Sequence, residues 1–217
     1  MKIFVDTANL NEIKKAKMLG LVDGVTTNPT LLSKEGEETE SLIRKISGVV
    51  EGPVNVEVTG TTFEEMVKEA REMATWGDQI AIKIPINREG LRTVKVLSSE
   101  GILTTVTLVF SASQAILAAK AGATYVCPFI GRLDDIGFNG LDLVSQIRTI
   151  YDNYNEIKTQ IIVASVRNPI HVIEAAMMGA EIVTVPPAVI DQMARHPLTD
   201  KGIAQFLEDA KKTSIKK

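Results

Sequence analysis

The sequence has very little of what a disulfide-bonded, metal-binding or membrane-spanning protein needs. Cys127 is the only cysteine among 217 residues, so no intramolecular disulfide can form and a reducing cytoplasm is the expected location. Neither of the two histidines, His171 and His196, has a cysteine or acidic partner at metal-ligand spacing, and we interpret both as structural. Asp6 interrupts the first apolar residues before a signal peptide can develop, and no later apolar run is long enough to span a membrane.

The chain also lacks an excess of charge of either sign. Its formal net charge of −3 excludes the basic surface typical of nucleic-acid-binding proteins, and no acidic tail is present. No linker rich in proline, glycine or serine divides the sequence, and the length suits one large core. We therefore expect a single globular domain over residues 1–217.

Short β-branched runs alternate with longer stretches of helical periodicity, which is typical of repeated βα units. The eight runs expected to form strands are residues 2–5, 24–27, 54–58, 79–84, 102–107, 124–127, 160–164 and 181–185. Polar residues lie at or just after the ends of six of them, namely Asp6, Asn28, Glu57, Lys83, Thr107 and Ser165. A doubly wound open sheet would bring together only the strand ends at its switch point, whereas a barrel turns all of them toward one mouth. The sequence therefore predicts an α/β fold, a (β/α)8 TIM barrel.

Alternation along two of these runs predicts which side chains point into the barrel. Successive residues of a strand point to opposite faces, so the isoleucines of run 79–84 share a face opposite Lys83. In run 54–58 the valines share a face opposite Asn55 and Glu57. If the branched residues face the surrounding helices, Asn55, Glu57 and Lys83 point into the barrel and give it a charged lumen.

Lys83 is the residue that points most directly to chemistry. Burial favours the neutral amine, which is a nucleophile toward a ketone. The alternative is a strand-end charge or a structural ion pair, which is the more frequent state of a buried lysine. Asp6 and Glu57 end at the same mouth, where one carboxylate suits proton exchange with a substrate hydroxyl and the other suits a water. Two alternatives stay open: the acids neutralise Lys83, or the three residues hold Mg²⁺.

Two arginines follow neighbouring strands at the same face of the predicted barrel. Arg132 comes after the run 124–127 and Arg167 comes after the run 160–164. Two guanidinium groups on adjacent loops form a good clamp for a phosphate dianion. The alternative is a pair of solvated arginines, or arginines that pair with Asp134 and Asp135.

A further amphipathic stretch follows the last predicted strand and predicts an additional C-terminal helix. Within residues 201–211, Ile203, Phe206, Leu207 and Ala210 fall on one helical face. Because a barrel already covered by helices has little room for another, we expect this face to pack on a neighbouring subunit.

Four motifs resemble those of the transaldolase family, and the resemblance covers essentially the whole chain. They are Phe4-Val5-Asp6-Thr7-Ala8-Asn9, Gly24-Val25-Thr26-Thr27-Asn28-Pro29-Thr30-Leu31, Ile82-Lys83-Ile84-Pro85 and Pro128-Phe129-Ile130-Gly131-Arg132. The chain is similar to the short branch of the family, which is related to the fructose-6-phosphate aldolases. The resemblance implies a class I aldol mechanism without metal or organic cofactor, and a homo-oligomer, either a pentamer or a ring-shaped decamer. It also implies transfer of a dihydroxyacetone unit from sedoheptulose 7-phosphate or fructose 6-phosphate to an aldose phosphate, within the pentose phosphate pathway.

The resemblance assigns catalytic roles residue by residue. Lys83 matches the lysine that forms the Schiff base, and Asp6 matches the acid/base that handles the proton of the C4 hydroxyl. Glu57 matches the residue that works through a bound water, and Thr107 matches the threonine that helps to hold that water. Asn28 resembles the asparagine that contacts the dihydroxyacetone hydroxyls.

The remaining matches concern the phosphate and the choice between two enzymes. Arg132, Ser165 and Arg167 resemble the phosphate-binding group of the family. Glu57 and Phe129 favour a transaldolase, because fructose-6-phosphate aldolases typically have glutamine and tyrosine at these positions. The alternatives are such an aldolase, which releases free dihydroxyacetone, and a barrel that binds sugar phosphates without turnover.

Two positions depart from the family pattern. Thr105 stands where an asparagine is common, so one contact to a substrate hydroxyl is expected to be lost or replaced by water. Cys127 stands where a serine is common, and a thiol is the weaker hydrogen-bonding group.

Overall fold

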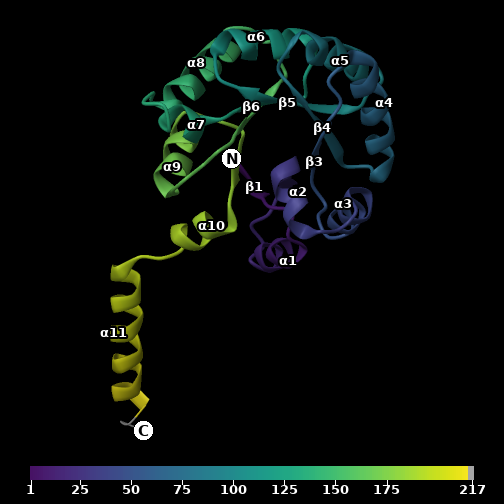
Figure 1. Ribbon diagram of the computed structural model, residues 1–217. Helices are drawn as coiled ribbons and strands as arrows, with labels where there is room; N and C mark the ends of the chain where they lie inside the picture. Colours follow the sequence, from purple (N-terminus) through teal and green to yellow (C-terminus); the bar gives the residue numbers. More distant parts are fainter. Residues whose placement is uncertain (215–217) are drawn as a thin grey trace.

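A computed structural model describes residues 1–214, and its centre is a closed barrel of parallel strands in the order β1 to β8 (Figure 1). The strands are β1 (Lys2–Asp6), β2 (Gly24–Thr26), β3 (Val54–Glu57), β4 (Ile80–Pro85), β5 (Leu103–Val109), β6 (Tyr125–Pro128), β7 (Gln160–Val163) and β8 (Ile182–Val185). Each lies within two residues of the bounds predicted for it. The predicted (β/α)8 barrel is therefore confirmed, together with its additional C-terminal helix.

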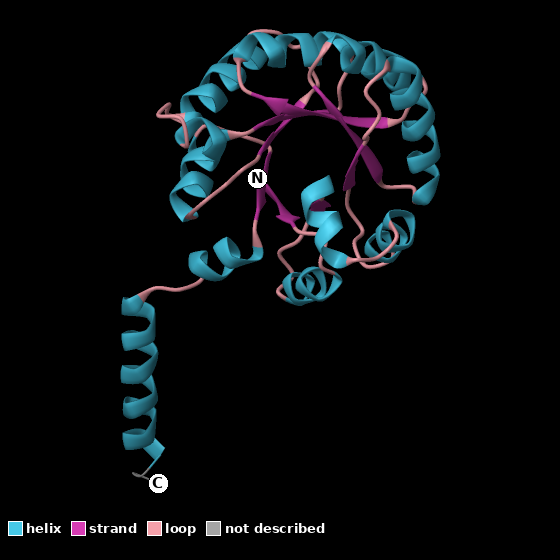
Figure 2. Ribbon diagram, in the orientation of Figure 1, coloured by secondary structure: helices cyan, strands magenta, loops and turns pink. Residues whose placement is uncertain are grey.

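Helices surround the barrel as an outer layer, except for the last one, which lies apart from it (Figure 2). They are α1 (Leu10–Met18), α2 (Pro29–Glu35), α3 (Thr39–Ser47), α4 (Phe63–Met73), α5 (Arg88–Ser99), α6 (Ala112–Ala121), α7 (Ile130–Asp134), α8 (Gly140–Asp152), α9 (Pro169–Met177), α10 (Pro187–Met193) and α11 (Pro197–Ser214), with a 3-10 turn, η1 (Ala74–Trp76), after α4. Asn28 illustrates how the loops are fixed, because its side chain accepts a hydrogen bond from the Leu31 N–H at 3.0 Å and caps α2. Asn28 thereby begins the helix that follows β2 at the mouth.

The two faces of the strands form two separate cores. The outward core packs strands on helices and includes the isoleucines of β4 and the valines of β3. The inward core is smaller and lies inside the barrel, and its members are Phe4, Ala81, Tyr125, Cys127, Ile162, Ala164 and Ile182. The predicted alternation is therefore correct: the isoleucines of β4 and the valines of β3 pack outward, and Asn55 and Lys83 are buried on the opposite face.

Helix α11 stands apart from the barrel (Figure 1). It follows α10 after a short connection and is longer than the predicted segment, because it begins at Pro197, a residue well suited to the first helical turn. Its predicted apolar face is exposed, with Ile203 54%, Phe206 76% and Leu207 59% accessible. These side chains are therefore available to a partner surface.

Candidate active site

A cavity of about 240 Å³ lies at the carboxyl ends of the strands, where a (β/α)8 barrel presents its loops. Seven predicted site residues line it: Asp6, Asn28, Lys83, Phe129, Arg132, Ser165 and Arg167. Of the other two, Glu57 contacts Lys83 from the neighbouring strand, and Thr107 lies in the lumen next to β4. The fold thus gathers residues from β1, β2, β4 and the segments after β6 and β7 at one place.

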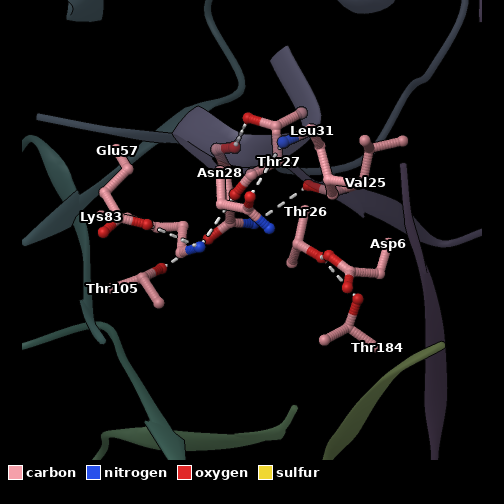
Figure 3. A network of polar contacts seen from close by, with 11 residues as sticks. Asp6, Val25, Thr26, Thr27, Asn28, Leu31, Glu57, Lys83, Thr105 and Thr184 are labelled. Carbon is pink, nitrogen blue, oxygen red and sulfur yellow. Dashed lines mark hydrogen bonds and ion pairs between the residues drawn. The ribbon is translucent and has the colours of Figure 1, made fainter. Parts of the chain in front are cut away.

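Lys83 is held inside the mouth by polar partners. Its side chain is only 3% exposed, because it follows the inward face of β4 while the adjacent isoleucines pack on the helices. The Nζ atom donates to the Thr27 carbonyl at 2.8 Å and lies 3.0 Å from Glu57 Oε2 (Figure 3). The sequence left open a structural ion pair, and the amine does have one. Lys83 nevertheless lines the cavity, so its amine can reach a molecule bound there.

Asp6 lies across the mouth from Glu57 (Figure 3). Its Oδ1 accepts a hydrogen bond from Thr26 Oγ1 at 2.7 Å, and Thr26 Oγ1 lies 2.6 Å from Thr184 Oγ1. Because Thr26 donates to Asp6, it must accept from Thr184. Burial raises the pKa of Asp6, and the Thr26 bond and the charge of Lys83 oppose that shift in part. Asp6 can therefore hold a proton at a higher pH than an ordinary aspartate.

Thr26 and Thr184 are site residues that the sequence analysis missed. Both are 2% exposed and both line the cavity. A signal was present, since each is a polar residue on the inward face of an otherwise apolar strand. Threonine is also a favourable strand residue, so it did not stand out there.

Thr107 and the two departures from the family pattern lie in or beside the lumen. The Thr107 hydroxyl is buried and has no nitrogen or oxygen partner among residues 1–214, and it lies beside the Cys127 thiol, with which it interacts. Thr105 donates to Asn55 Oδ1 at 2.6 Å, and Asn55 Nδ2 donates to the Val25 carbonyl at 3.3 Å. Burial raises the pKa of Cys127 to about 12, so this thiol stays protonated and unreactive at neutral pH.

Two basic side chains, those of Arg132 and Arg167, line the cavity after β6 and β7. Arg132 lies over the Phe129 ring, with 4.9 Å between the guanidinium carbon and the ring centroid. Arg167 pairs with Asp135 at 2.7 Å, and both side chains are more than half exposed. The ion pair with Asp135 that the sequence left open is thus present. It is exposed and weak, so it does not prevent Arg167 from binding an anion.

The backbone of the segments after β6 and β7 is tightly packed. Ser165 has a φ of +61°, an uncommon conformation for a residue other than glycine. A Cβ atom at Gly131 would lie 2.1 Å from the Ser165 carbonyl oxygen and 2.6 Å from Arg167 Nε. Only glycine therefore fits at position 131, and its absent side chain lets the segments after β6 and β7 meet.

The structure also bears on two possibilities considered from the sequence, a metal site and a membrane-spanning helix. In residues 1–214, no three His, Cys, Asp or Glu side chains are grouped as a metal site requires. No helix in this part of the chain combines the length and apolar character needed to cross a bilayer.

Comparisons with known proteins agree on one family. A family model described as Transaldolase/Fructose-6-phosphate aldolase matches residues 3–217. A protein of Caldicellulosiruptor saccharolyticus named "probable transaldolase" is 56% identical over 216 residues, which cover 100% of both chains. Another of that name, from Thermoplasma acidophilum, is 57% identical over 217 residues and covers 99% of this chain and 97% of its own.

Among solved structures, similarity extends to distant barrels. An N-acetylmannosamine-6-phosphate 2-epimerase from Clostridium perfringens has a TM-score of 0.60 at 14% identity, with 87% of each chain covered. A thiamine phosphate pyrophosphorylase from Pyrococcus furiosus has the same TM-score at 16% identity, with 88% of this chain and 89% of its own covered. At such low identity the likeness concerns the fold alone.

Proposed function

The chain belongs to the transaldolase/fructose-6-phosphate aldolase family, and we propose that it is a transaldolase that acts through a Schiff base on Lys83. It moves a dihydroxyacetone unit from a ketose phosphate to an aldose phosphate. The observation that carries this proposal is a buried amine, 3.0 Å from Glu57, at the wall of a cavity that also contains Asp6 and two arginines.

The Lys83–Glu57 pair supplies both forms of the amine. Glu57 accepts a proton from the ammonium group, and the neutral amine attacks C2 of the ketose. The proton returns to the carbinolamine oxygen, which leaves as water, so the positive charge of the ammonium group ends on the iminium. Overall, one ammonium and one ketone give one iminium and one water.

Asp6 acts on the bond that is broken and made. As a carboxylate it takes the proton of the C4 hydroxyl while the C3–C4 bond breaks and its electrons pass into the iminium, giving an enamine. The acid then returns this proton to the carbonyl oxygen of the incoming aldehyde. The raised pKa of Asp6 suits both steps, because it brings the donor and acceptor forms closer in energy.

The other predicted residues bind the substrate. Asn28 contacts the hydroxyls of the three-carbon unit, and Arg132, Ser165 and Arg167 bind the phosphate. Thr107 shares a water with Glu57, and its buried hydroxyl, which has no nitrogen or oxygen partner among residues 1–214, supports this role.

Borohydride reduction tests the covalent step. In the presence of fructose 6-phosphate, reduction should inactivate the protein and attach a substrate carbon chain to Lys83, located by peptide mass spectrometry. Lys83→Met is the matched control and should remain unlabelled. Labelling of another lysine, or no labelling with full activity, contradicts the assignment.

Capture of the three-carbon unit distinguishes a transaldolase from an aldolase. Consumption of fructose 6-phosphate should depend strongly on erythrose 4-phosphate, with little free dihydroxyacetone formed. Equal consumption without acceptor, with stoichiometric dihydroxyacetone, makes the protein a fructose-6-phosphate aldolase instead.

The assembly forms part of the same proposal. We place α11 on a neighbouring barrel in a pentamer or decamer, because its apolar side chains are exposed on its own subunit. Light scattering of the full chain and of a chain ending before Pro197 should give a large and a smaller particle. A monomeric full chain contradicts the proposal. The single buried thiol supports a cytoplasmic location.

A further inference from the structure

A second cleft lies on the far side of Glu57 from the substrate cavity. It has a volume of about 400 Å³ and is lined by residues of α2, α3 and α4, of which α2 and α3 lie near β3 in Figure 1. Its lining includes Leu32, Ser33, Thr39, Glu57, Glu72 and Trp76. Lys83 lines the substrate cavity and Glu57 lines this cleft, although their charged atoms are 3.0 Å apart. The ion pair is therefore the wall between two cavities.

The cleft reaches the surface. Ser33 and Glu72 at its rim are exposed, while Leu32 and Trp76 in its lining are buried. The rim is also fixed in place, because Glu69 accepts hydrogen bonds from the Thr59 and Gly60 N–H groups, each at 2.9 Å. Water can therefore reach Glu57 without passing through the substrate cavity.

The proposed reaction needs such a path. Each turnover releases one water when the donor ketose forms its imine, and it consumes one water when the product imine is hydrolysed. At both moments, in the proposed reaction, a sugar phosphate occupies the cavity that Lys83 and the two arginines line. The bound sugar therefore blocks the direct exchange of water between Lys83 and solvent.

We propose that the cleft between α2, α3 and α4 is the water route to and from the Lys83–Glu57 pair, an inference that rests on the proposed Schiff-base function. Glu57 passes the proton from the ammonium group to the carbinolamine oxygen, and the water so formed leaves on the Glu57 side. In hydrolysis a water enters from the same side, loses a proton to Glu57 and adds to the iminium carbon. No other reactant is required.

Filling the cleft tests the route. Ser33→Trp places a large side chain at the rim, whereas Lys34→Trp places the same group at the next, exposed position of α2, which does not line the cleft. In ¹⁸O-labelled water, each cycle of imine formation and hydrolysis replaces the C2 oxygen of the ketose, which mass spectrometry detects. Exchange of the C2 oxygen should slow on the order of tenfold in Ser33→Trp, because the new side chain obstructs the path of water between solvent and Glu57. Exchange should be unchanged in Lys34→Trp.

Binding of a substrate analogue separates obstruction from distortion. A ketose phosphate reduced at C2 to the alcohol cannot form an imine, and it should bind to Ser33→Trp as it binds to the wild type. If its binding weakens, α2 has moved, and Thr39→Trp, which fills the cleft from α3, decides the question. Wild-type exchange rates in the deciding variant overturn the water route. An absence of exchange in the wild type overturns the proposed function itself.

Discussion

Replacing Lys83 with methionine and Glu57 with glutamine, singly and together, should reveal a coupling free energy of about 1.5–3 kcal/mol between the two side chains. Methionine keeps most of the apolar stem of lysine, and glutamine keeps the shape of glutamate. The cycle therefore measures the interaction of the charges. The bond from Lys83 to the Thr27 carbonyl is lost in every variant that lacks Lys83, so its contribution cancels.

The expected magnitude follows from the distance and burial of the pair. At 3.0 Å and an effective dielectric constant of about 20, the attraction is roughly 5–6 kcal/mol. Desolvation offsets much of this, because the Lys83 side chain is 3% exposed. Glu57 is less costly to bury, since 13% of its side chain remains accessible. What remains should match a hydrogen bond between charged groups, which is the range given above.

Urea unfolding of the four proteins at neutral pH and equal protein concentration measures the coupling. All three variants should also lose the borohydride-trapped adduct or form it more slowly. A coupling below about 0.5 kcal/mol would mean that the two groups are solvated separately, and the proton exchange assigned to them would then lack its structural basis.

Three further substitutions test the rest of the mouth. Because burial raises the pKa of Asp6 above 3.8, ionised Asp6 opposes folding, and this cost is absent at low pH and grows as the pH rises through the folded-state pKa. Asp6→Asn should therefore raise the free energy of unfolding at about pH 7, and the gain should be smaller toward about pH 4. The same variant should lose activity. A gain in the free energy of unfolding that does not depend on pH, measured by urea titration, would contradict this reasoning. Arg167→Ala should weaken binding of phosphorylated ketoses by about tenfold to a hundredfold and leave unphosphorylated ketoses nearly unaffected, as measured by KM; an equal loss for both would make Arg167 structural. Phe129→Tyr should increase the release of free dihydroxyacetone without acceptor, because a phenol can donate a proton to the enamine carbon; an unchanged ratio of release to transfer would remove Phe129 from this role.

The barrel could be predicted because local and global patterns agree along the whole chain. The strands are rich in β-branched residues, polar side chains mark the ends of six of the eight, and parity alone places Lys83 and Glu57 in the lumen. The same parity rule applies to Thr26 and Thr184, but a threonine is as frequent in an ordinary strand as in a polar network. Only the closed barrel shows that these two hydroxyls meet beside Asp6.

Contacts between loops could not be derived in the same way. The sequence offered Asp135 and a phosphate as competing partners for Arg167, and the conformations of the loops after β6 and β7 decide which one it meets. The neighbour of α11 is likewise open, because periodicity identifies an apolar face but not the surface that covers it. Periodicity and strand parity therefore do not predict contacts between loops that are distant in the sequence.

The close packing at Gly131 sets limits on any attempt to redesign this enzyme for sugars without a phosphate. A mutant library that varies position 131 would consist mostly of damaged barrels, since even a methyl group there collides with the Ser165 carbonyl. Arg132 and Arg167 line the cavity and do not have this restriction, because Arg167 is more than half exposed and Arg132 lies over an aromatic ring. Selection for neutral acceptors should therefore enrich changes at these two arginines and return glycine at position 131 in every surviving clone.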